Sequence, residues 1–190
     1  MTKIVLVRPG STDYDHQQRI QGNLDVPLNR QGSVEVAKLI EELGGLPIEA
    51  VYAPLCEPAH QTAKALAAAL HVRCRKLDQM TNLNHGLWQG MRVDEVRRKY
   101  PRVYRQWQEQ PQSVQPPEGE TVDQAMHRIQ TAMAKLLKKH KEAMIALVLP
   151  EPIASLVRQH LDHGELGDLW KASLGHGRWE LCDVPSSVIA

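Results

Sequence analysis

Charged and polar side chains directly follow two expected strands of this chain. Arg8 and Thr12 come after the apolar segment Lys3–Val7, and Glu151 comes after the apolar run Ala143–Leu149. Because parallel strands in α/β sheets place their sites beyond their carboxyl ends, these side chains are expected at one edge of the sheet. A guanidinium beside a hydroxyl can bind an anion. Arg8 could instead form a buried ion pair with a nearby carboxylate, and both interpretations stay open.

Prolines stand at the same two strand ends. Pro9 follows Arg8 directly, and Pro150 precedes Glu151. Proline has no nucleophilic atom, lacks a backbone N–H and fixes φ, so both positions favour a rigid turn over a reactive group. Pro152 is expected as the first residue of the following helix.

Other side chains offer different chemistry. Ser11, Thr12 and Cys56 are possible nucleophiles, although Glu57 beside Cys56 disfavours the thiolate. Hard oxygen donors and imidazoles could bind zinc or manganese, but no His-x-x-x-His spacing supports a metal site. Packing or solvation is the structural alternative for each group. The possible metal ligands are Asp15, His16, Glu57, His60, His85 and Glu151.

Strand and helix patterns alternate along the chain, as is typical of a three-layer α/β sandwich with a mostly parallel central sheet flanked by helices. Strands are expected at Lys3–Val7, Glu49–Tyr52, Val72–Lys76, Ala143–Leu149 and Arg178–Val184. Helices are expected at Arg30–Leu43, Glu57–Leu70, Val93–Tyr100, Val103–Gln108, from the Thr121 cap to about His140, and at Ile153–Leu161.

Composition restricts the class of protein. The chain has 190 residues, 42% of them hydrophobic, and a formal net charge of +1. This length suits one domain, and the charge gives no support for nucleic-acid binding. No apolar stretch is long enough to span a membrane, and no signal peptide is apparent. Three cysteines in no metal or disulfide pattern indicate reduced thiols and a cytoplasmic protein.

Several motifs in order resemble the histidine phosphatase superfamily, which is phosphoglycerate-mutase-like, from about Ile4 to Leu156. The resemblance implies a single domain over residues 1–190. The motifs are Leu6–Thr12, Arg19–Leu28 with Gly32, Val51–Leu55 with Ala59–Ala63, Gly86–Gly90, and Pro116–Glu120 with Arg128.

The resemblance implies a phosphate site that this chain has altered. In the family one histidine carries a phosphoryl group, while a second histidine, two arginines and an asparagine bind its oxygens and a glutamate handles a proton. Arg8 and Thr12 match this pattern. The histidine positions are Pro9 and Pro150, and the other altered positions are Asp15, Glu57 or Pro58, Asn82 and Glu151. Arg8, Asp15, Glu57 and Glu151 together carry a formal charge of −2, which predicts repulsion of a phosphate.

These changes favour a catalytically inactive protein that senses a ligand or binds another protein. Two alternatives stay open: a phosphomonoesterase or phosphoglycerate-mutase-type enzyme with a rearranged metal- or cysteine-dependent mechanism, and a structural homodimer subunit. No cofactor, metal, nucleic acid or membrane is expected, whereas a small polar or phosphorylated ligand is. The expected ligand-binding residues are Arg8, Thr12, Asp15, Arg19, Gln21, Gly22, Glu57, Asn82 and Glu151.

Overall fold

The computed structural model describes residues 2–172 and 175–185, which fold around a five-stranded sheet of order β3-β2-β4-β1-β5. Four strands are parallel, and β5 pairs antiparallel with β1. The predicted α/β sandwich with a mostly parallel sheet is confirmed. The strands are β1 (Lys3–Val7), β2 (Ile48–Ala53), β3 (Arg73–Lys76), β4 (Met144–Val148) and β5 (Trp179–Asp183).

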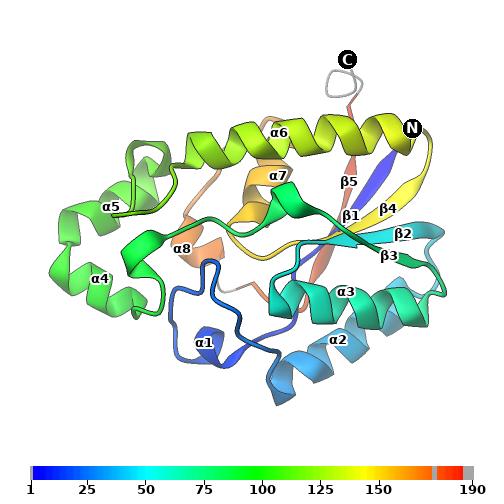
Figure 1. The fold of residues 1–190 in the computed structure, drawn as a ribbon, viewed down its shortest axis with the longest axis horizontal. Coiled ribbons are helices and arrows are strands. Elements are labelled where there is room, and N and C mark those ends of the chain that lie inside the picture. The colour runs from blue at the N-terminus through cyan, green and yellow to red at the C-terminus, as the bar shows by residue number, and fades with distance from the viewer. Residues whose placement is uncertain (1, 173–174, 186–190) are drawn as a thin grey trace.

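Helices cover both faces of this sheet (Figure 1). On one face lie α2 (Arg30–Leu43) and α3 (Glu57–Ala69), and on the other lie α6 (Val122–Lys139) and α7 (Ile153–Asp162). The remaining helices are α1 (Asp13–His16), α4 (Val93–Lys99), α5 (Pro101–Glu109), α8 (Leu169–Ala172) and the 3-10 turns η1 (Asp78–Met80), η2 (Gly86–Trp88) and η3 (Pro111–Ser113). The short helices α1 and α8 were not predicted from the sequence.

The central strands alternate between two hydrophobic cores. In β1, Ile4 and Leu6 pack under α6 and α7, whereas Val5 and Val7 pack against α2 and α3. All four side chains are fully buried. The period of two follows from the strand geometry, in which successive side chains point to opposite faces. Burial on both faces explains why the sequence of β1 contains a continuous apolar run.

Capping side chains set the helix starts that the sequence predicts. Asn29 accepts a hydrogen bond from the Gly32 N–H at 2.8 Å and starts α2. Thr121 and Gln124 form a reciprocal capping box at the start of α6. Pro152 differs from the prediction by one position, because it caps α7 rather than being its first helical residue.

None of the helices among residues 2–172 and 175–185 combines the length and the apolar character that crossing a bilayer requires.

Candidate functional site

The carboxyl ends of β1 and β4 meet at one edge of the sheet and border a cavity of about 320 Å³. Val7 is in register with Val148, and the Leu149 N–H donates to the Val7 carbonyl at 2.9 Å. Pro9 and Pro150 therefore lie side by side, and both line the cavity. The expected meeting of the two strand ends is confirmed.

Arg8 does not reach this cavity, because carboxylates on two other elements enclose its guanidinium. Its Nε donates to Glu151 Oε1 at 2.9 Å, and its Nη1 donates to Glu180 of β5. The Arg8 and Glu151 side chains are only 6% and 4% exposed. Burial alone lowers the pKa of Arg8, but the two carboxylates raise it by more, so the guanidinium stays charged. Of the two interpretations of Arg8, the buried ion pair is the one observed.

Asp15 and Thr12 lie on the other side of Pro9 and together start α1. The Thr12 N–H and hydroxyl both donate to Asp15 Oδ2, at 2.7 and 2.8 Å. Thr12 is completely buried and does not line the cavity, whereas Asp15 does. The Thr12 hydroxyl is therefore engaged in helix capping, and one oxygen of Asp15 remains turned toward the cavity.

That second oxygen, Asp15 Oδ1, lies 3.6 Å from His176 Nε2. Both side chains are about one-fifth exposed and line the cavity. The backbone fixes the position of His176, because the neighbouring Gly177 N–H donates to the Pro9 carbonyl at 2.9 Å. A histidine from the segment before β5 is therefore held beside Pro9.

Sequence reasoning missed His176 as a site residue. It lies outside the motifs that resemble the family. The usable signal was its place just before the last expected strand, although only the antiparallel pairing of β5 with β1 brings it to Pro9.

Four more expected residues line the cavity: Arg19, Gln21, Gly22 and Asn82. Arg19 is anchored by donating to the Gly90 carbonyl at 2.6 Å. Asn82 is 3% exposed, and its Nδ2 donates to the Gly22 carbonyl at 3.1 Å. Asn82 thus holds the loop that borders the cavity and has no ionisable proton to transfer.

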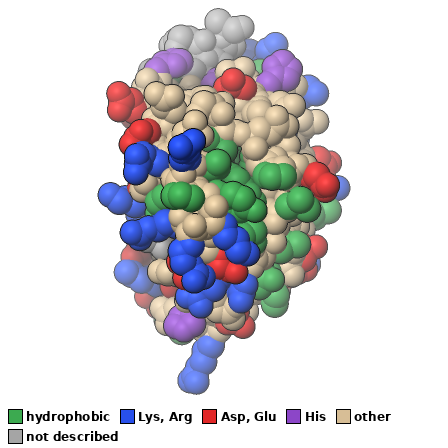
Figure 2. Space-filling model, turned by 90° about the vertical axis from the view of Figure 1, so that its left-hand side faces the viewer, with side chains coloured by type: hydrophobic (Ala, Val, Ile, Leu, Met, Phe, Trp, Pro, Cys, Tyr) green, Lys and Arg blue, Asp and Glu red, His purple; other side chains and the backbone are tan. Residues whose placement is uncertain are grey.

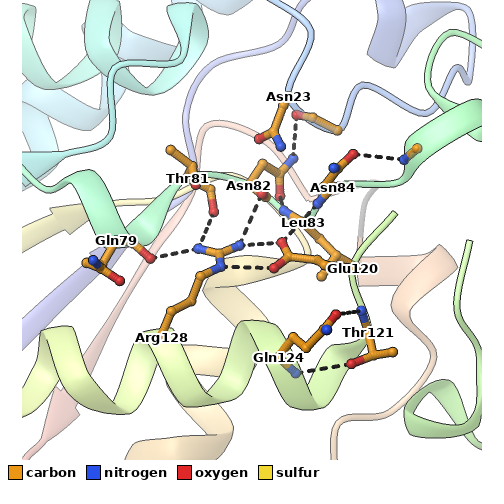
Figure 3. A network of polar contacts seen from close by, with 12 residues as sticks. Asn23, Gln79, Thr81, Asn82, Leu83, Asn84, Glu120, Thr121, Gln124 and Arg128 are labelled. Carbon is orange, nitrogen blue, oxygen red and sulfur yellow. Dashed lines mark hydrogen bonds and ion pairs between the residues drawn. The ribbon is translucent and has the colours of Figure 1, made fainter. Parts of the chain in front are cut away.

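A polar network behind the cavity fixes Asn82 (Figure 3). Arg128 of α6 donates to the carbonyls of Gln79, Thr81 and Asn82 and pairs with Glu120 at 2.6 Å. One guanidinium thereby satisfies three carbonyls, that of Gln79 in η1 and those of Thr81 and Asn82 in the segment that leads to η2. This explains how the motif containing Arg128 contributes to the site without touching the cavity.

Two other expected groups lie outside the cavity lining. Glu57 begins α3 and is not among the lining residues, although Pro58 is. Cys56 is also absent from the lining, and burial together with Asp25 and Glu57 raises the pKa of its thiol to about 11. A thiolate nucleophile at Cys56 therefore has no structural support.

The site is less acidic than expected, for a physical reason. Glu151 pairs with Arg8, which also pairs with Glu180, and Glu57 lies outside the cavity lining. Among the other cavity-lining side chains, the carboxylates Asp15, Asp94 and Asp168 are matched by the cations Arg19, Arg97 and Lys171. Figure 2 shows Lys and Arg side chains gathered on the face formed by the α4–α5 side of the molecule. The cavity is therefore not closed to an anion.

Comparison with known proteins connects this architecture to a family. The family model "Histidine phosphatase superfamily (branch 1)" matches residues 4–185. Phosphoserine phosphatase 1 of Hydrogenobacter thermophilus is 30% identical over 148 residues, which are 78% of this chain and 70% of that relative. The metal-independent phosphoserine phosphatase of Arabidopsis thaliana is 30% identical over 154 residues, 78% of this chain and 63% of that relative.

A solved structure shares the fold. The mycobacterial glucosyl-3-phosphoglycerate phosphatase Rv2419c, in complex with VO3, superposes with a TM-score of 0.88 at 21% identity, covering 98% of this chain and 93% of that one. The relatives bear the names of phosphatases, and this finding overturns the interpretation of the chain as a catalytically inactive protein. The chain belongs to the histidine phosphatase superfamily, branch 1.

Proposed function

We propose that this protein hydrolyses a phosphate monoester in the cavity beside Pro9, with His176 and Asp15 as its proton-transfer pair. In this proposal Pro9 and Pro150 occupy the positions of the family's two histidines, so the reaction needs a different group. The placement of the His176–Asp15 pair beside Pro9 carries the proposal. The names of the phosphatase relatives support the reaction class.

The pair suits general-base chemistry. Asp15 faces Nε2 of His176, which favours the tautomer with the proton on Nε2 and leaves the Nδ1 lone pair for a water molecule. The distance of 3.6 Å exceeds a hydrogen bond, as is common for catalytic contacts before substrate binds. Asp15 would then stabilise the imidazolium that forms when His176 accepts a proton.

The reaction balances with these groups alone. His176 removes a proton from water, whose oxygen forms a bond to phosphorus while the bond between phosphorus and the ester oxygen breaks. The imidazolium then returns the proton to the departing alkoxide, giving an alcohol and inorganic phosphate. Arg19, Arg97 and Lys171 line the same cavity and supply positive charge for the phosphoryl oxygens.

The alternatives with a metal or a cysteine have less support. Among the described residues, no three His, Cys, Asp or Glu side chains converge as a ligand set. The buried Cys56 thiol with its raised pKa lies outside the cavity lining. Both groups in the His176–Asp15 pair, by contrast, line the cavity.

The test is turnover of 4-nitrophenyl phosphate by the wild type and His176→Gln. Loss of a general base is expected to lower kcat by at least about 100-fold, because such groups contribute roughly 10²–10⁴-fold. His16→Gln is the matched control, since His16 is exposed, follows Asp15 directly and does not line the cavity. Equal turnover by wild type and His176→Gln would refute this assignment. An acid-labile phosphohistidine on the quenched wild type would refute the general-base step.

We also propose a cytoplasmic location. Cys56, Cys74 and Cys182 are all free thiols, which suits a reducing compartment. Fractionation with antibody detection tests this proposal, and recovery of the protein outside the cytoplasm would refute it.

A further inference from the structure

One wall of the cavity is built from four rings, each in contact with the next. Tyr104 stacks on Trp170 with ring centroids 5.3 Å apart and an interplanar angle of 11°. Trp170 meets Trp107 at 5.9 Å, and Trp107 meets His85 at 5.4 Å. All four side chains line the cavity, and we call them the aromatic wall.

The aromatic wall is unusual for this sequence. The chain has four Trp, four Tyr and no Phe, and the wall contains two of these Trp and one of these Tyr. Its members come from three separate elements, namely α5, α8 and the residue that caps η2. The helices α4 and α5 that carry much of this side lie away from the sheet in Figure 1. Three of the eight Trp and Tyr side chains of the chain thus line one cavity.

His85 adds an unpartnered polar atom to the wall. His85 borders the cavity but is only 5% exposed, and its Nδ1 is itself buried and has no hydrogen-bond partner among residues 2–172 and 175–185. Burial lowers the pKa of His85 to about 4, so the imidazole is neutral near neutral pH. A buried polar atom without a partner is unfavourable, and a ligand group that hydrogen-bonds to it would relieve that cost.

The cavity therefore has two chemically different parts. Asp15, His176 and Pro9 form the part where the proposed reaction takes place. The aromatic wall offers the partly exposed ring of Tyr104, backed by the buried rings of Trp170 and Trp107, with the buried imidazole of His85 behind them. A hydrogen bond from Gln108 to Asp168, at 3.1 Å, links α5 to the segment that leads into α8 beside this wall.

We propose that the ester's alcohol is a planar aromatic or heteroaromatic compound whose ring lies against the aromatic wall and whose polar substituent hydrogen-bonds to His85 Nδ1. This inference rests on the proposed phosphatase function and names its substrate class. Ring stacking favours aromatic over saturated groups of equal size, because flat π faces attract one another beyond simple burial. The hydrogen bond to His85 selects among aromatic compounds.

Binding of non-hydrolysable ligands tests the ring preference without requiring turnover. Benzyl phosphonate and cyclohexylmethyl phosphonate have the same charge and similar size, and their affinities can be followed by tryptophan fluorescence. The aromatic ligand is expected to bind several-fold more tightly. Tyr104→Leu should reduce that preference, whereas Tyr100→Leu should leave it unchanged, because Tyr100 is 46% exposed and does not line the cavity.

A second pair of ligands tests the role of His85. The wild type should bind 4-hydroxybenzyl phosphonate more tightly than benzyl phosphonate, by about tenfold. His85→Phe keeps a ring of similar size and removes the hydrogen-bonding nitrogen, so it should lose this preference and retain benzyl phosphonate binding. A preference for the hydroxylated ligand that persists in His85→Phe would overturn the assigned hydrogen bond.

Turnover separates this inference from the proposed function. Aromatic-selective binding without hydrolysis of benzyl phosphate would support the aromatic wall as a ligand site and refute the phosphatase proposal. Hydrolysis with equal kcat/KM for benzyl and cyclohexylmethyl phosphates would support the phosphatase proposal and overturn the aromatic preference. Equal affinity for both phosphonates, unaffected by Tyr104→Leu, would also overturn it.

Discussion

Two pairs, each of a carboxylate and a nitrogen-bearing side chain, flank Pro9, and they differ in burial and in separation. Arg8 and Glu151 are in contact at 2.9 Å and are about 95% buried, and Glu151 also accepts hydrogen bonds from the Ser155 N–H and hydroxyl. Asp15 and His176 are 3.6 Å apart and about one-fifth exposed. The closed pair, joined by Glu180, keeps its charged groups in contact with one another and holds the strand ends together. The open pair keeps a nitrogen and a cavity available, which is what a reaction needs.

Replacing Arg8 is expected to give the largest effect on stability. Arg8→Met leaves the buried Glu151 carboxylate without its counter-ion, which should lower the free energy of unfolding by about 3–5 kcal/mol. Urea denaturation measures this change. Lys38→Met is the control, because the Lys38–Glu42 pair is exposed and should contribute less than about 1 kcal/mol. Equal effects of the two substitutions would contradict a stabilising role for the buried Arg8–Glu151 pair.

His85 borders the cavity but is as buried as the Arg8–Glu151 pair. Its burial should make the free energy of unfolding depend on pH. The unfolded chain binds a proton at His85 below about pH 6.5, whereas the folded protein does so only below about pH 4. Stability is therefore lost as pH falls from 6.5 to 4, by about 3 kcal/mol at 1.36 kcal/mol per pKa unit. His85→Phe should lack this part of the pH dependence in unfolding measurements between pH 4 and 7. Parallel curves for the two proteins would contradict the burial of a neutral imidazole.

Replacing the carboxylate of each pair with an amide compares the two pairs directly. Glu151→Gln weakens charged hydrogen bonds and should lower the free energy of unfolding by about 1.5–3 kcal/mol. Asp15→Asn retains an oxygen to cap α1, so stability should change little, while kcat should fall at least tenfold, or about 1.4 kcal/mol in activation free energy. Denaturation and turnover assays on both variants measure these effects. If Glu151→Gln lowered mainly kcat and Asp15→Asn lowered mainly stability, the roles proposed for the two pairs would be wrong.

Cys56 should give the smallest effect. Its thiol has a pKa of about 11, caused mainly by burial, and it does not line the cavity. Cys56→Ser is expected to leave kcat within about twofold of the wild type. A large loss of turnover would make Cys56 part of the reaction and would move the active site away from His176.

Contacts between neighbouring strand ends could be predicted from the sequence, and contacts made by the last strand could not. Arg8 and Glu151 follow two apolar runs, so their ion pair was among the stated alternatives. Glu180 and His176 reach the same edge only because β5 inserts antiparallel beside β1. No motif or spacing encodes that pairing. Helix starts were predictable at Asn29 and Thr121 because the caps are local.

The charge of the site could not be predicted either. Adding formal charges over matched positions treats every carboxylate as facing the ligand. In the folded chain, Glu151 pairs with Arg8 and Glu57 lies outside the cavity, whereas Arg97 and Lys171 arrive from helices that the matched motifs do not contain. The net charge of a site therefore depends on which side chains face the cavity, and their positions in the sequence do not determine this.

The pairing of β1 has a consequence for folding during synthesis on the ribosome. Lys3 is in register with Met144 on one side and with Asp183 on the other. The first strand is thus synthesised long before either of its neighbours, and its two unpaired edges are open to other chains in the meantime. Such distant strand pairing forms slowly. Residues 175–183 complete the sheet, bring Glu180 to Arg8 and bring His176 to Asp15, so a nascent chain without them lacks all three features.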